Sequence, residues 1–354
     1  MPVYNAEVIP IYMKNMPETI ADSDAPSLGF TQPSIALPMD RYRLWFSSAQ
    51  EPIFSDFPGS AWRGALGHSL RRLACTTGET ECRRCAEYQR CHYTAIFESP
   101  LPQGAGKMTK YASVPNPYVL EPQDQIRKES DGRYTVCLQL TLIGRSRRQA
   151  SLMVEAFREA AGGPRGIAGN RMKWVGVERE DPLGSGAWMA EALDPARAAL
   201  RPRAIPMPPA PPEITLHFLT PLRVKRDGAR VRVEDFRFSD FFINLMRRIS
   251  MLTYFHTPVP HEADFRGLAE ASRKLDVLSK LEWCDMGRYS FRQKASMEMG
   301  GLVGSIAIHS ESLSIFWPYL WLGQWTHAGT GATMGLGQYQ LQTRRDRDAD
   351  ANSK

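Results

Sequence analysis

The chain has 354 residues, with 44 basic against 38 acidic side chains and a formal net charge of +6. This length is enough for two ordinary domains, each with its own core. No apolar run is long enough to cross a bilayer, and residues 1–37 lack the basic start and apolar block of a signal peptide. The sequence therefore predicts a cytoplasmic protein without a membrane partner, and its modest positive charge permits an anionic partner.

The chain opens with an arm and a strand-helix pair. Residues 1–38 are rich in proline and small polar residues, which predicts an extended or disordered arm. Residues 41–46 alternate apolar and polar side chains, as a strand does. A helix is expected from residue 59, with Ser60 as its cap and His68 off the centre of its buried face. That face is formed by Trp62, Leu66, Leu70 and Leu73.

Four cysteines follow this helix with the spacing Cys-x6-Cys-x2-Cys-x5-Cys: Cys75, Cys82, Cys85 and Cys91. They supply the four thiolates of a closed tetrahedral zinc site, and a reducing compartment favours metal binding over disulfides. Such a site has no open position for a substrate. The sequence therefore predicts a structural zinc insertion at residues 75–91, with four free thiols as the alternative.

The first domain is expected to continue to residue 200. A loop at residues 101–113 carries Lys107, and strands are expected at 133–143 and 172–177, with a helix at 147–161 between them. Six prolines between residues 202 and 212 then predict a semi-rigid connector outside either core, so the domain boundary is placed at 201–212.

The second domain is expected to span residues 213–343, followed by a charged tail at 344–354. Strands are predicted at 213–224 and as an antiparallel meander at 280–286, 289–297 and 302–309; helices are predicted at 241–255, 268–278 and 313–325. Strand and helix order recurs in both halves. This recurrence predicts an α+β fold of two sandwiches, each a sheet with helices on one face.

A glycine-rich loop at residues 329–337 separates the last helix from the last strand. Its four glycines can adopt positive φ and let another backbone approach their amides. The loop is not a P-loop, because Gln338 and Tyr339 follow Gly337, and its spacing does not fit the dinucleotide fingerprint. It therefore predicts contact with a phosphate chain, with a tight turn between buried elements as the alternative.

Three motifs resemble the RAMP superfamily, and most closely its CRISPR-associated endoribonucleases that process precursor guide RNA, the Cas6 family. The motifs are Gly-Ser-x-x-Arg-Gly at the first helix, the cysteine insertion ending near Tyr93 and Phe97-Glu98, and the closing His-x-Gly-x-Gly-x-x-x-Gly-x-Gly-x-Tyr. The resemblance covers residues 40–343. It implies two tandem ferredoxin-like (RRM-like) domains that cut CRISPR repeat RNA by attack of the 2'-hydroxyl on the adjacent phosphate, with no catalytic metal, and that can remain bound to the mature guide RNA.

The resemblance also implies roles for individual residues. His68 matches the placement of the catalytic histidine, Lys107 is expected to supply positive charge, and His327 is a second catalytic candidate. The RNA-binding residues are expected to be Arg72, Arg145, Arg147, Arg148, His327, Gly329, Thr330, Gly331, Thr333, Gly335 and Gly337. The chain departs from the family at Thr330 and Gln338, where basic residues are common. Backbone amides and hydroxyls of the loop are therefore expected to make more of the contacts with RNA.

Two rival functions stay open on the sequence. One is a non-catalytic RAMP subunit that binds guide RNA beside other CRISPR effector subunits. The other is a zinc-containing DNA-binding regulator, because basic residues flank the cysteines. No recognition helix with helix-turn-helix spacing supports the regulator.

Overall fold

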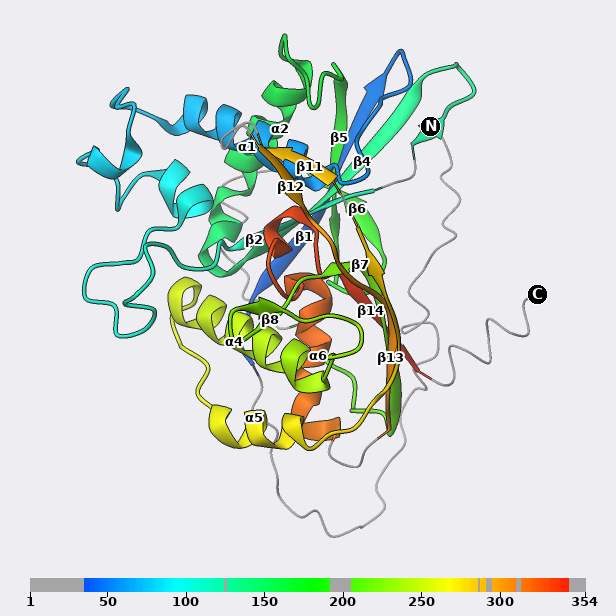
Figure 1. Cartoon of the computed structure of the whole chain (residues 1–354). Helices are drawn as coiled ribbons and strands as arrows, with labels where there is room; N and C mark the ends of the chain where they lie inside the picture. Colours follow the sequence, from blue (N-terminus) through cyan, green and yellow to red (C-terminus); the bar gives the residue numbers. More distant parts are fainter. Residues whose placement is uncertain are drawn as a thin grey trace, which may run out of the picture.

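The structure is a computed structural model that describes residues 35–123, 126–191, 205–285, 287–290, 295–309 and 313–343. Residues 1–34 of the predicted arm, residues 192–204 with the start of the predicted connector at 201–212, and the predicted tail at 344–354 lie outside these residues. Figure 1 shows a mixed α and β molecule in two halves, each with helices packed beside a sheet. No helix in the described ranges is both long and apolar enough to cross a membrane.

The first half forms an antiparallel sheet with the strand order β2-β4-β1-β5-β6, and a short β3 pairs with β4. Its elements are β1 (Met39–Ser48), α1 (Gly59–Ala74), β2 (Tyr118–Pro122), β3 (Arg127–Lys128), β4 (Tyr134–Ile143), α2 (Ala150–Gly162), β5 (Lys173–Glu180) and β6 (Trp188–Ala190). Apart from the short β3 and β6, the chain order is strand-helix-strand-strand-helix-strand. This is the order expected of a ferredoxin-like domain.

One face of this sheet packs on α1 and α2. Tyr42, Leu44 and Phe46 point inward from β1, and the ring centroids of Phe46 and Trp62 lie 5.5 Å apart. Burying side chains of this size stabilises the fold by about 1.5–3 kcal/mol each. The predicted stripe on α1 is confirmed except at its end, because Leu73 in the last turn is 41% exposed. The predicted Ser60 cap is wrong: α1 already begins at Gly59, and no side chain caps it.

The second half repeats this arrangement with the strand order β10-β13-β7-β14. Its elements are β7 (Glu213–Leu222), α4 (Phe238–His256), α5 (Phe265–Arg273), β10 (Leu278–Cys284), β13 (Gly301–His309), α6 (Leu313–Thr326) and β14 (Tyr339–Thr343). Numbered along the chain, the four strands of each repeated unit lie in the order second, third, first, fourth. The two halves therefore share one topology.

The predicted meander is wrong in its middle strand. β10 pairs directly with β13, while β11 (Gly287–Ser290) and β12 (Ala295–Glu298) form a separate two-stranded hairpin. The predicted helix at 268–278 corresponds to α5, which begins earlier, at Phe265, and ends earlier, at Arg273. Leu278, the last residue of the predicted helix, belongs to β10. Alternation alone does not say which strand pairs with which.

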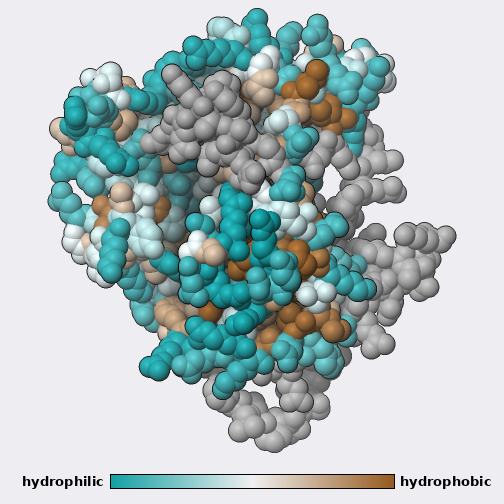
Figure 2. All heavy atoms as spheres, viewed as in Figure 1, coloured by the Kyte–Doolittle hydropathy of each residue, from teal (hydrophilic) through white to brown (hydrophobic). Residues whose placement is uncertain are grey.

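The two halves share a hydrophobic core. Leu37, Met39 and Val119 of the first half belong to the same buried cluster as Leu320 and Trp325 of α6. The surface seen in Figure 2 is mainly hydrophilic, and hydrophobic side chains gather there in small patches. This face is therefore better suited to a polar partner than to an extended apolar one.

The described part of the proline-rich connector also packs on α6. The indoles of Trp317 and Trp321 donate hydrogen bonds to the carbonyl oxygens of Pro208 and Pro206 at 2.7 and 3.0 Å. Met207 packs against the shared core between them. This part of the connector therefore contacts the core instead of spanning solvent.

Candidate functional site

The exposed face of α1 carries His68, as the helical spacing predicted. Gly64, His68 and Arg72 lie four residues apart, so they follow one another along one side of the helix, and all three are exposed. A Cβ added at Gly64 would meet nothing within 4 Å, so a ligand backbone can approach the helix there. Within the described residues, no hydrogen bond orients the His68 imidazole.

Arg72 forms an ion pair with Glu159 of α2, with 2.5 Å between Nη2 and Oε1. The two side chains are 60% and 33% exposed. Exposed ion pairs contribute little to stability, about 0–1 kcal/mol, because water screens them. Arg72 can therefore exchange this carboxylate for another anion at small cost.

The structure does not place Lys107 beside His68, where the sequence predicted that it would supply positive charge. Its Nζ is 4.9 Å from the ring centroid of Tyr254 on α4 and 3.9 Å from Oε1 of Glu262. Among the described residues, Lys107 contacts Tyr254, Phe265 and Glu262, and none of its contacts is with His68. The structure therefore pairs Lys107 with the second half of the chain and leaves the proposed charge beside His68 to Arg72.

The three arginines after β4 differ in what surrounds them. Arg147 is buried and its Nε lies 2.6 Å from Oδ2 of Asp40, so it stabilises the first sheet and is not an exposed RNA ligand. Arg145 donates a hydrogen bond to the carbonyl oxygen of Phe255 at the end of α4. Arg148 is exposed. The sequence-based assignment of Arg147 to RNA binding is therefore corrected, because burial removes its guanidinium from solvent.

The glycine loop sits between the two halves. Its short 3-10 turn, Ala332–Met334, packs on the start of α1, where a Cβ at Gly59 would lie 1.8 Å from the carbonyl oxygen of Met334. Gly335 has φ +95°, and a Cβ there would lie 2.8 Å from the carbonyl oxygen of Leu120 in β2. Only glycine permits both approaches. The loop of the second half is therefore docked against the helix that carries His68.

Most of the loop's amides already have acceptors within the protein. Gly329 N–H donates to Oδ1 of Asn244 at 3.0 Å, and Gly337 N–H donates to the carbonyl oxygen of Pro221 at 3.1 Å. Thr330 N–H likewise bonds a backbone carbonyl. Thr330 is exposed, whereas Gly335 and Gly337 are buried. The loop thus serves as a tight turn, the alternative that the sequence allowed, and at its tip exposes Thr330 and parts of Gly331 and Thr333 to a ligand.

A buried polar network joins this loop to the first sheet. The Glu121 carboxylate accepts hydrogen bonds from His327 at 3.0 Å, from Gln338 at 2.9 Å and from Arg41 at 2.9 Å. Burial by itself raises the pKa of Glu121, but the Arg41 guanidinium and the His327 hydrogen bond outweigh it and hold that pKa at about 2. The group is therefore a carboxylate at neutral pH.

His327 is fully buried in this network, with a side-chain exposure of 0%. It cannot contact RNA or reach His68 from that position, which corrects its assignment as an RNA-binding residue and as a second catalytic candidate. Gln338, which replaces the basic residue common in the family, donates to the same carboxylate. Glu121 was missed from the sequence because a lone glutamate near the end of an apolar strand carries no recognisable signal.

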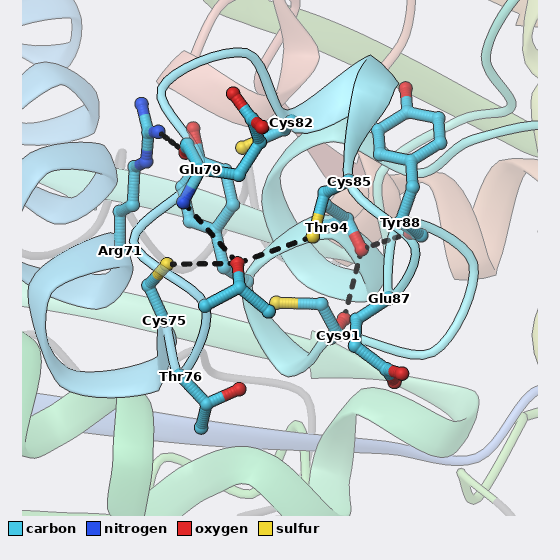
Figure 3. Close-up of a pocket in the computed structure, with 12 residues that line it drawn as sticks. Arg71, Cys75, Thr76, Glu79, Cys82, Cys85, Glu87, Tyr88, Cys91 and Thr94 are labelled. Atoms are coloured by element: carbon cyan, nitrogen blue, oxygen red, sulfur yellow. Dashed lines mark hydrogen bonds between the residues drawn. The ribbon is translucent and has the colours of Figure 1, made fainter.

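The four cysteines of the insertion are brought together around one pocket, which Figure 3 shows. All four are free thiols. Among the residues that the structure describes, no group of three or more His, Cys, Asp or Glu side chains already stands in a metal-holding arrangement.

Comparisons with known proteins agree with this architecture. Residues 216–339, which contain the glycine loop, match the family model of the CRISPR-associated endoribonuclease Cas6. This region is Cas6-like. Residues 37–203 match a family model described as an N-terminal domain. The chain has no significant match among curated proteins.

Solved structures support a Cas6-like fold. A Cas6 product complex gives a TM-score of 0.52 at 16% identity, over 86% of this chain and 100% of that chain. A second Cas6 product complex gives 0.47 at 15% identity, over 87% and 100%. A partial Cas6-RT-Cas1--Cas2 complex gives 0.49 at 13% identity, over 88% and 47%. At such identities the likeness concerns the fold alone. Of these three structures, only the first has a TM-score above 0.5, and the conclusion on the fold rests on it.

Proposed function

We propose that this chain binds CRISPR repeat RNA and cuts it at one position in each repeat, producing mature guide RNA. The match of residues 216–339 to the Cas6 endoribonuclease model carries the proposal. In this proposal both halves are ferredoxin-like domains. The docking of the glycine loop on α1 supports it, because the loop of one domain then contacts the helix that carries the exposed histidine of the other.

The proposed reaction needs no metal ion at the cut. The 2'-oxygen attacks the adjacent phosphorus as its proton leaves, and the bond from phosphorus to the 5'-oxygen breaks. The products are a 2',3'-cyclic phosphate and a free 5'-hydroxyl. His68 either accepts the proton of the 2'-hydroxyl as general base or donates a proton to the departing 5'-oxygen as general acid, and water makes the other transfer. Arg72, one turn further along α1, moves from Glu159 to the phosphate and stabilises its growing negative charge.

The geometry of α1 sets the path of the RNA in this proposal. The glycine loop meets α1 at Gly59, nine residues before His68, which is about 14 Å along the helix axis. The loop tip and His68 therefore contact different nucleotides of one strand. The strand runs along the exposed side of α1 and passes Gly64, where the helix leaves room for it.

A cleavage assay in EDTA tests the proposal. End-labelled RNA carrying the repeat of the neighbouring CRISPR array is incubated with the protein, beside an RNA with a single 2'-deoxy nucleotide before the cut. We expect a single cut in the first RNA and none in the second. Cutting of both RNAs would exclude the 2'-hydroxyl as nucleophile.

The rival reading is a RAMP subunit that binds guide RNA without cutting it. The one observation in its favour is that no described hydrogen bond orients His68, whereas a catalytic base is usually held by a third group. Tight binding of intact RNA by the wild-type chain in the same assay would support this reading and reject the nuclease.

A further inference from the structure

The segment between α1 and Tyr93 has no core of its own. None of residues 75–92 is buried, and the six side chains that are partly covered are the four cysteines, Glu79 and Tyr88. Apart from Ala74, the neighbours of each cysteine along the chain are exposed. Of these 18 residues, only Cys82 and Cys91 pack on the core of the first half. This apolar burial is too small to offset the conformational entropy lost on ordering the segment, so something else must hold it together.

The four cysteines converge although 16 residue steps separate the first from the last. They line one pocket, drawn in Figure 3. The Thr77 hydroxyl lies among them, 3.3 Å from Sγ of Cys85 and 4.0 Å from Sγ of Cys75. Cys82 and Cys85 are joined by a tight turn, in which Cys85 N–H donates to the carbonyl oxygen of Cys82 at 3.1 Å. This turn is the one that a Cys-x-x-Cys pair uses to point both sulfurs at one ion.

We propose that Cys75, Cys82, Cys85 and Cys91 bind one Zn²⁺ ion, which folds the insertion. Four thiols lose their protons and become the four ligands of a closed tetrahedral site. Because the described side chains are not yet in a metal-holding arrangement, the sulfurs turn inward on binding and the Thr77 hydroxyl moves aside. Four sulfur ligands leave no open position, so the ion is structural.

The ion would also brace the helix that carries His68. The insertion ends in the π-helical turn Thr94–Glu98, whose Phe97 stacks on Tyr93 with ring centroids 5.5 Å apart. Phe97 lies so close to α1 that a Cβ at Gly67 would be 2.5 Å from its ring. The guanidinium of Arg63 lies 4.2 Å from the centroid of the same ring. Loss of the ion would therefore loosen the packing directly beside His68.

Metal analysis of the full chain, purified in reducing buffer without added metal, tests the inference. We expect about one zinc per chain in the wild type and in Cys284→Ser, a control in β10 outside the cluster. We expect less than a tenth of that in Cys82→Ser and in Cys91→Ser. Equal zinc in all four proteins, or no zinc in the wild type, would overturn the inference, as would co-purifying iron and sulfide.

Limited trypsin digestion gives a readout that does not depend on RNA. Arg83, Arg84 and Arg90 are exposed within the insertion and supply cleavage sites. We expect cuts there only after a strong chelator has removed the ion, and protection again when ZnCl₂ is restored. Co²⁺ added to the stripped chain should show the intense visible bands of tetrahedral thiolate coordination. The same digestion pattern with and without zinc would refute the structural role, whatever the outcome of the RNA assay.

Discussion

The imidazole of His327 lies 3.0 Å from the carboxylate of Glu121, although 206 residues separate them in the chain. Because the pKa of Glu121 is held at about 2, the carboxylate is ionised and accepts this bond, so Nε2 of His327 carries the hydrogen. This pair joins the residue just before the glycine loop to the first sheet, and it is one of the contacts that hold the loop over α1.

Glu121→Ala is expected to destabilise the protein by about 1–3 kcal/mol, because it leaves the buried His327 side chain without its acceptor and removes one of the two carboxylate partners of the half-buried Arg41. Chemical denaturation followed by circular dichroism measures the change in the free energy of unfolding. Glu51→Ala, at an exposed position, is the control and should change it by less than about 0.5 kcal/mol. Equal stability of the two variants would show that the pair does not hold the halves together.

The lowered pKa of buried His256 predicts that the protein loses stability in mild acid. Burial lowers the pKa of this residue to about 4, and its Nε2 lies 2.8 Å from the carbonyl oxygen of Pro115 in the first half. Unfolding restores a pKa near 6.5, so the unfolded chain binds the extra proton first. The contribution of neutral His256 to the free energy of unfolding is therefore complete above about pH 6.5 and is lost as the pH falls toward 4. Melting temperatures of the wild type and His256→Gln measure it, and parallel curves from pH 8 to 4 would contradict it.

Gly335→Val is expected to undock the glycine loop. Valine strains at φ +95°, and its Cβ would press on the carbonyl oxygen of Leu120. We expect a lower melting temperature and an RNA affinity at least tenfold weaker. Gly228→Val is the control, because Gly228 also has positive φ but a Cβ there meets nothing within 4 Å. Full RNA affinity in Gly335→Val would mean that the docked position of the loop is unimportant for binding.

His68→Ala is expected to slow RNA cutting by about 10²–10⁴-fold, the usual contribution of a general acid or base. Affinity should change by less than about threefold, because the side chain is exposed and no described hydrogen bond depends on it. Single-turnover cleavage and filter binding separate the two effects. Zinc content is measured after the EDTA incubation, so that a loosened insertion is not mistaken for lost catalysis. Cutting at the wild-type rate would remove His68 from the mechanism.

Gly64→Leu tests the proposed path of the RNA along α1. Leucine is a better helix former than glycine, and the position is open, so the fold should be at least as stable as the wild type. We expect weaker RNA binding, because the side chain would occupy the approach beside His68. Unchanged affinity in a stable variant would place the RNA on another surface.

The sequence by itself determined most of the elements and their order. Alternation along β1, the stripe of α1, the apolar run of α6 and the four loop glycines are local patterns, and each corresponds to the element it predicted. Local patterns suffice there because the side-chain period reports which face of a strand or helix is buried. The spacing of the four cysteines likewise anticipated that they would meet at one pocket.

Only the tertiary structure decided which polar residues are buried and which strands pair. His327 and Arg147 look like surface residues in the sequence, but His327 is buried in a hydrogen bond to Glu121 and Arg147 is buried in an ion pair with Asp40. The sequence pattern also did not reveal that β11 and β12 form a separate hairpin. The physical reason is the same in each case: the free energy of a buried charge or a paired strand depends on a partner brought from a distant part of the chain, and the local pattern does not name that partner.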